Sequence, residues 1–322
     1  MSVRSLWLAA LGRVRRAPAL VVILWLASLA ITVPPAFAIY SAINTHLDSS
    51  LEADTAADGM NYDWMQEFRA QAGPLGRTLR PEVIGFAAVL DNTSALADAT
   101  LRPPGVVLGS VTFVLLVWFV SPGAIAKLAT DRSADSGTFL YYCGAFGFRM
   151  LRLGIFALAA YIVLFGSLHA WLFDDVFESV TRNLTVERTA FFIRLALYIV
   201  FFAILALVNL AIDLAKVRMV VEDRRSVLGA VSAAVRFIRA NPRVTIGAYA
   251  MNVLAFVVVL AVYAAVAPGA GSAGISMWAG FVVGQLYVLA RLVVKLAFWA
   301  SEIVALQTRF RCPRFLRAAR AA

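Results

Sequence analysis

The sequence predicts an all-α polytopic membrane protein with six transmembrane helices and with amphipathic helices on the cytoplasmic membrane surface. Of the 322 residues, 61% are hydrophobic and only 15% are charged, whereas soluble domains carry about 25% charged residues. Several apolar runs reach the roughly 18 residues that a helix needs to cross a bilayer. A helix bonds all of its own backbone groups in lipid, so these runs indicate spans.

The six predicted spans belong to one membrane domain that covers residues 1–322. Pro34-Pro35 lies near the end of the first span, and Pro122-Gly123 is expected to kink the inner end of the second. The basic start of the first span is similar to a cleavable signal peptide, but its apolar run is long, so we expect an uncleaved anchor. The spans run about 17–40, 105–128, 153–172, 189–214, 244–266 and 277–300.

The longest hydrophilic segment, residues 41–104, is predicted to be an extracytoplasmic loop. It contains nine acidic residues and four arginines, for a net charge of −5. Within it, residues 61–71 and 83–97 are expected to form short helices on the outer membrane surface. Tyr62, Trp64 and Phe68 are expected to anchor this segment at the membrane interface.

The distribution of charge predicts the orientation of the chain. Lysine and arginine that flank spans stay in the cytoplasm, so we expect an inner (plasma) membrane protein with both termini cytoplasmic. Cys143 and Cys312 then lie on the cytoplasmic side and are expected to be reduced. The segments 1–16, 129–152, 216–243 and 307–322 are net basic, and the segments 41–104 and 173–188 are net acidic.

Residues 226–243 are predicted to form a basic amphipathic helix on the cytoplasmic leaflet. Ser226 is a suitable N-cap, and Asn241-Pro242 is a stop followed by a new start. At about 100° per residue, one arc of about 120° holds Val227, Leu228, Val231, Ala234, Val235 and Ile238. Beside it lie four arginines that are predicted to contact anionic lipid headgroups: Arg225, Arg236, Arg239 and Arg243. The alternative is a helix that packs on other cytoplasmic segments.

This helix has two relatives within the chain. The segments SLWLAALGRVRRAPAL and SAAVRFIRANPRV each place arginines before a proline and a span. Before the third span, in the connection 129–152, a similar stripe consists of Phe139, Tyr142, Cys143, Phe146 and Met150. These patterns predict three parallel units, each an interfacial helix followed by a two-span hairpin. Chance similarity among segments rich in arginine and alanine is the alternative.

Two longer pieces resemble known proteins. AKVRMVVEDRRSVLGAVSAAVRFIRANP and GQLYVLARLVVKLAFWASEIVALQ are similar to several groups of largely uncharacterised bacterial multi-span inner-membrane proteins. With the connection between the second and third spans, the resemblance covers about a quarter of the chain. It implies a six-span architecture and brings no catalytic motif.

No motif for catalysis or cofactor binding occurs in the sequence. A Gly-rich phosphate loop, CxxC, HExxH and GxSxG are all absent. The two histidines, His46 and His169, lie in different outer regions, which leaves little for a metal centre or a triad. We therefore expect no catalytic residue, metal or cofactor. The predicted function is a non-enzymatic envelope protein that binds membrane lipids or a partner protein, which could be a second copy. Nucleic acid is not expected as a partner, because the arginines cluster beside spans.

Polar residues inside the spans form a candidate cluster, which consists of Asn209, Asp213, Asn252, Gln285, Arg291 and Lys295. Ionisable groups in spans are costly and usually face the bundle interior. Asp213 is the carboxylate nearest in depth to Arg291 and Lys295. The cluster could be a pocket for a headgroup or small anion, as in a transporter or channel subunit for a small solute or lipid. The sequence favours the alternative, in which these residues join helices and the two cations reach to the headgroups.

Overall fold

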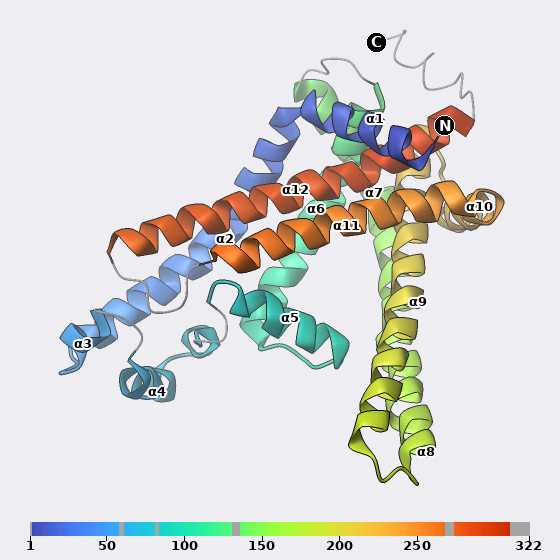
Figure 1. The fold of residues 1–322 in the computed structure, drawn as a ribbon. Helices are drawn as coiled ribbons and strands as arrows, with labels where there is room; N and C mark the ends of the chain where they lie inside the picture. Colours follow the sequence, from blue (N-terminus) through green and yellow to red (C-terminus); the bar gives the residue numbers. More distant parts are fainter. Residues whose placement is uncertain (1, 58–60, 81–83, 131–135, 268–273, 310–322) are drawn as a thin grey trace. The chain divides into compact units, whose positions relative to one another are not determined.

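The computed structural model describes residues 2–57, 61–80, 84–130, 136–267 and 274–309, and in these ranges the regular structure is helical throughout. Six helices are long and apolar enough to cross a membrane, as predicted, so the chain is a polytopic membrane protein (Figure 1). They are Pro18–Leu47, Pro104–Thr130, Gly137–Thr181, Glu187–Val221, Pro242–Val266 and Ile275–Thr308. Cys312 and the basic C-terminal tail lie outside the described residues.

The helices fold into two compact units. The first unit comprises Met1–Ala17, Trp118–Met251 and Ala297–Ala322, and the second comprises Pro18–Val117 and Asn252–Leu296. Three helices contribute residues to both units: α6 (Pro104–Thr130), α11 (Pro242–Val266) and α12 (Ile275–Arg309). The single membrane domain over residues 1–322 stays a prediction.

The second unit holds α2 (Pro18–Leu47) and a folded outer segment with the two short helices that the sequence predicts. These are α4 (Tyr62–Gln71) and α5 (Ala87–Ala97); α3 (Ala53–Ala57) and a 3₁₀ turn at Gly76–Thr78 accompany them. The side chain of Asn61 begins α4 by accepting hydrogen bonds from the backbone N–H groups of Asp63 and Trp64.

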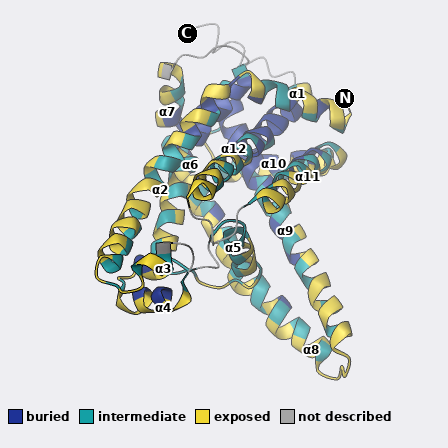
Figure 2. Cartoon of the chain, turned by 60° about the vertical axis from the view of Figure 1, so that its left-hand side comes forward, coloured by how far each residue is buried: buried dark blue, intermediate teal, exposed yellow. Residues whose placement is uncertain are grey.

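Two of the three predicted interfacial anchors in this segment are buried instead. Trp64 and Phe68 are 6% and 1% exposed, and their rings stack with centroids 5.4 Å apart. The indole Nε1 of Trp64 donates to His46 Nδ1 on α2 at 3.1 Å. The anchor prediction was therefore wrong for Trp64 and Phe68, because α4 turns its aromatic face onto the end of α2 (Figure 2). Tyr62 remains exposed.

The first unit contains a long helical hairpin. In it α7 (Ser136–Ile162) runs beside α9 (Glu187–Val221), as Figure 1 shows. Two π-helical turns, Val163–Leu168 and Trp171–Val176, and α8 (Phe177–Thr181) connect them. Phe201 is fully buried between the arms, whereas many large apolar side chains point outward and are exposed. Such a surface is typical of helices that face lipid.

The start of α7 corrects the predicted border between the connection 129–152 and the third span. α6 extends to Thr130, and α7 passes from Ser136 into the span without a break. The predicted stripe is real, since Cys143, Phe146 and Met150 are at most 6% exposed. Its residues nevertheless belong to the spanning helix, because no proline or capping residue separates them from it.

The other two predicted interfacial helices are separate elements. α1 (Val3–Arg15) precedes α2, and α10 (Val227–Ala240) precedes α11; each ends before a proline that begins the next helix, Pro18 or Pro242. Proline suits the first turn of a helix because its missing N–H would have no intrahelical partner there. The predicted short-helix-then-span pattern therefore occurs at two of its three expected places.

Candidate functional site

α10 begins and ends where the sequence predicts. The hydroxyl of Ser226 accepts a hydrogen bond from the N–H of Gly229 at 3.1 Å, which caps the first turn. Asn241 closes the helix, and Pro242 starts α11. The chain therefore changes direction between α10 and α11, at Asn241. α10 is a short helix that packs on the end of α9 (Figure 1).

The face of α10 that packs on the protein consists of small residues. Ala230, Ala233, Ala234 and Phe237 are at most 3% exposed, and they lie within one arc of about 100°. Alanine lets two helices approach closely, which explains the tight contact with α9. Only Ala234 of this set belongs to the arc that the sequence singled out.

The predicted arginines in and beside α10 and Leu228 of the predicted apolar arc are exposed, whereas the rest of the arc is partly or fully buried. Leu228 is 68% exposed, while Val227, Val231, Val235 and Ile238 are half-buried. The four arginines predicted to contact headgroups are all exposed: Arg225, Arg236, Arg239 and Arg243. The alternative of packing on another segment is confirmed, because the helix packs on α9, and contact of its exposed residues with the membrane stays a prediction. We call the surface formed by the arc and the four arginines the α10 surface.

A buried charge network fixes α10 to α9. Arg218 on α9 donates to the carboxylate of Glu222 at 2.9 Å and to the carbonyl of Ala233 on α10 at 2.6 Å. Arg224 pairs with the second oxygen of Glu222 and donates to the carbonyl of Gly229. Arg218 is 6% exposed, and a buried charge is tolerated when it is paired and hydrogen-bonded in this way. The predicted polar cluster did not include Arg218 or Glu222. Their i,i+4 spacing was the signal in the sequence that could have predicted this ion pair.

α1 is held in the same manner. Its Leu6, Ala10 and Val14 are buried. Arg13 donates to the carbonyl of Leu128 in the last turn of α6 at 3.2 Å and to Gln307 Oε1 on α12 at 2.7 Å. Both α1 and α10 are therefore hydrogen-bonded to longer helices of the first unit.

Asp213 lies in the same stretch of α9 as the network. Its carboxylate accepts from the Lys216 ammonium at 3.0 Å, one helical turn away. The ammonium also lies 3.9 Å from the ring centroid of Trp118 on α6, a cation–π contact. Asp213 and Lys216 are 8% and 6% exposed, so the pair is buried.

The remaining predicted polar residues are distributed over both units. In the first unit, Asn209 accepts a hydrogen bond from the Tyr161 hydroxyl. In the second unit, Gln285 accepts from Trp25 Nε1 at 2.9 Å, and Arg291 is exposed with its guanidinium over the ring of Tyr287. Also in the second unit, Asn252 is fully buried and Lys295 is half-buried. It stays a prediction that these residues form one cluster. The pairing of Asp213 with Arg291 or Lys295 also stays a prediction.

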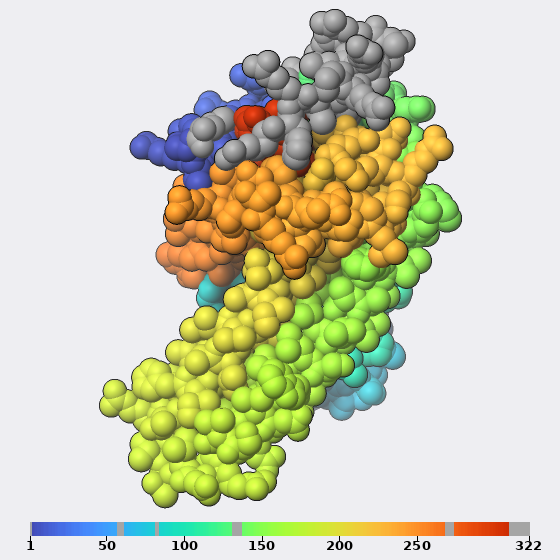
Figure 3. Space-filling model, turned by 90° about the vertical axis from the view of Figure 1, so that its right-hand side faces the viewer, coloured from blue at the N-terminus to red at the C-terminus, as the bar shows by residue number. Residues whose placement is uncertain are grey.

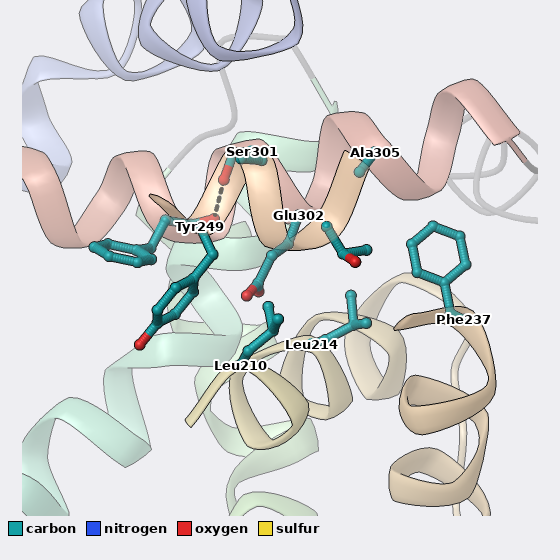
Figure 4. Close-up of a pocket in the computed structure, with 10 residues that line it drawn as sticks. Leu210, Leu214, Phe237, Tyr249, Ser301, Glu302 and Ala305 are labelled. Carbon is teal, nitrogen blue, oxygen red and sulfur yellow. Dashed lines mark hydrogen bonds between the residues drawn. The ribbon is translucent and has the colours of Figure 1, made fainter. Parts of the chain in front are cut away.

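The first unit also encloses a narrow cavity with a carboxylate beside it. Its lining includes Leu210, Leu214, Phe237, Tyr249, Ser301 and Glu302. The side chain of Glu302 extends from α12 toward the two leucines of α9 (Figure 4). The volume of about 10 Å³ has room for about one water molecule. Glu302 was not among the predicted polar residues, because the predicted span ended at residue 300, whereas α12 continues to Arg309.

No family model, curated protein or solved structure matches the chain. Within the described ranges, no three His, Cys, Asp or Glu side chains gather closely enough to hold a metal ion. The α10 surface is the most distinctive feature that remains.

Proposed function

We propose that the protein is a non-enzymatic protein of the bacterial inner membrane whose α10 surface binds anionic phospholipids of the cytoplasmic leaflet. The observation that carries this proposal is the combination of three exposed arginines, Arg225, Arg236 and Arg239, with the exposed Leu228 of the apolar arc beside them. Arginines that reach an anionic surface contribute about 1 kcal/mol each. The apolar arc suits the boundary between headgroups and acyl chains.

The attachment of α10 supports the same role. An isolated amphipathic helix must fold and orient when it binds, which costs ordering entropy. Here the contacts of Arg218 with Glu222 and with the Ala233 carbonyl hold the helix before any lipid arrives. The basic flanks of the spans support a cytoplasmic position for α10 and for both termini.

Native mass spectrometry of the full chain in detergent tests the proposal. We expect wild-type protein to retain dioleoyl phosphatidylglycerol in preference to dioleoyl phosphatidylcholine. The double variant Arg236→Gln/Arg239→Gln should retain fewer phosphatidylglycerol molecules than the wild type. The matched control is Arg69→Gln/Arg188→Gln, which removes the same charge from two exposed arginines on other helices, α4 and α9. Equal retention of both lipids by the wild type would overturn the proposal.

The alternative, a transporter or channel subunit, has less support. The cavity beside Glu302 has room for about one water molecule and is lined mainly by apolar side chains. It would have to widen greatly to hold a solute. Transport therefore stays a prediction of the sequence.

A further inference from the structure

A groove lies between α7 and the beginning of α10, on the side of the first unit that faces the viewer in Figure 3. One wall is the α7 face with Arg152, Ile155, Phe156 and Ala159, and the other is the segment 225–228. The groove is open along its length and has a volume of about 660 Å³. That volume is within the range of small-molecule sites in proteins.

Two arginines from different elements meet at this groove. Arg152 comes from α7 and Arg225 from the turn before α10, and both are exposed. Among the described residues, neither takes part in an ion pair. Asp223, the acid nearest along the chain to Arg225, is bound to Arg149 at 2.5 Å. The groove therefore carries uncompensated positive charge, which favours an anionic occupant.

The ion pair between Arg149 and Asp223 connects the two walls of the groove. It joins α7 to the turn between α9 and α10, and these are the elements that form the two walls. Arg152 and Arg225 therefore lie on two elements that this ion pair joins. A guanidinium binds phosphate oxygens through a planar fork of N–H donors, so two of them can share one phosphate.

Apart from Ser226 the rest of the groove is apolar, and the wall formed by α7 belongs to a spanning helix. Arg152, Ile155, Phe156 and Ala159 are spaced i, i+3, i+4 and i+7, so they lie along one face of α7 over about 10 Å. Ile155 is 62% exposed, and Leu228 on the opposite wall is 68% exposed. A free phosphate would leave this strip uncovered, whereas an acyl chain would cover it. The occupant that fits has an anionic head and an apolar tail.

We propose that the groove binds one anionic phospholipid, with its phosphate between Arg152 and Arg225 and an acyl chain along Ile155, Phe156 and Ala159. This site rests on the proposed function, since it takes the same class of lipid. The groove site differs from the rest of the α10 surface in stoichiometry. The groove binds one lipid, whereas the rest of the surface contacts many headgroups. The site also includes α7, which the proposed function does not require.

Titration of the full chain in detergent with dioleoyl phosphatidylglycerol, read by native mass spectrometry, tests this site. We expect one lipid to bind more tightly than all others in the wild type. Arg152→Gln and Arg225→Gln should each weaken that first lipid about tenfold, since each removes a charge-assisted contact to phosphate. Both side chains are exposed, so the melting temperature should not change.

The variant Arg236→Gln/Arg239→Gln separates this proposal from the general one. It should keep the first tight lipid and lose the later, weaker ones. If it abolishes the first lipid while Arg152→Gln has no effect, the groove is overturned and the diffuse surface stands. If no variant and no lipid type makes a difference, both proposals fail.

The apolar wall has its own test. Ala159→Trp fills the groove beside Ile155 and should weaken the first lipid about tenfold, while both arginines remain in place. Soluble glycerol 3-phosphate should compete poorly, because it lacks the chain that covers the strip. Competition as strong as that of the lipid would overturn the lipid assignment and leave a simple phosphate site.

Discussion

The guanidinium of Arg218 on α9 donates to the main-chain carbonyl of Ala233 on α10, across 15 residues of sequence, while its other nitrogens hold Glu222. One buried side chain thus joins two helices and satisfies a carboxylate. We expect Arg218→Met to lower the free energy of unfolding by about 1–3 kcal/mol, because Glu222 keeps only Arg224 as a partner and the Ala233 carbonyl loses its donor. Thermal unfolding in detergent micelles measures this.

The control for that change is Arg236→Met on the same unit. Arg236 is exposed, so the same substitution there should alter stability by less than about 0.5 kcal/mol. Similar losses in both variants would mean that total charge, rather than the Arg218 contacts, stabilises the unit.

Asp213 and Lys216 are expected to be coupled. Asp213→Asn leaves the Lys216 ammonium buried without its carboxylate at 3.0 Å, which should cost about 3 kcal/mol and impair insertion. The double variant Asp213→Asn/Lys216→Met should recover part of this loss, since no unbalanced charge stays buried. Unfolding of the two single variants and the double variant gives the coupling energy. If Asp213→Asn keeps full stability but loses a bound lipid or solute, Asp213 lines a pocket instead.

Gly123 is required where α6 meets α7. A Cβ atom at this position would lie 2.6 Å from Cys143 Sγ and 2.8 Å from the ring of Phe139. Gly123→Ala should therefore destabilise the protein by about 1–3 kcal/mol. Gly144→Ala on α7 is the matched control, because a Cβ atom there meets no other atom within 4 Å. It should be neutral or stabilising by up to about 1 kcal/mol, because alanine has the higher helix propensity. Thermal unfolding compares the two.

The orientation can be tested with single cysteines. In a Cys312→Ser background the remaining Cys143 is 1% exposed and should react slowly. Tyr62→Cys should react with a membrane-impermeant maleimide in intact cells whose outer membrane has been made permeable. Arg239→Cys should react only after the inner membrane is opened. The reverse pattern would place α10 on the outer side and contradict the assignment to the cytoplasmic leaflet.

Local signals in the sequence were sufficient for the six helices and for the ends of α10. Ser226 and Asn241-Pro242 act on the backbone next to them, so their effect does not depend on distant residues. The face that α10 packs on α9 was not predictable in this way. Ala230 and Ala233 contribute little to hydrophobic periodicity, and the larger Leu228 and Val231 dominate the pattern although they pack less.

The other misses also have tertiary causes. Trp64 in a hydrophilic segment satisfies the rule for an interfacial anchor, and only the position of His46 on α2 reveals that it is buried. Because Arg149 and Arg152 are charged, they were assigned to a connection before the third span. They lie within α7 instead, since arginine is a good helix former and its charge can reach a partner or the surface. Glu302 lay beyond the predicted span, so its burial against α9 could not be expected.

The lengths of α9 and α12 have a final consequence for the environment of the buried charges. Each has 35 residues, which is about 52 Å at 1.5 Å per residue, while the hydrocarbon layer is about 30 Å thick. At an ordinary tilt, several turns of each must stand clear of the acyl chains. If the surplus is at the C-terminal ends, Lys216, Arg218 and Glu222 sit in a protein-built layer at the aqueous boundary. Substitutions of these residues should then change the free energy of unfolding as they would in the core of a water-soluble protein. Denaturants should unfold this layer as they unfold globular domains.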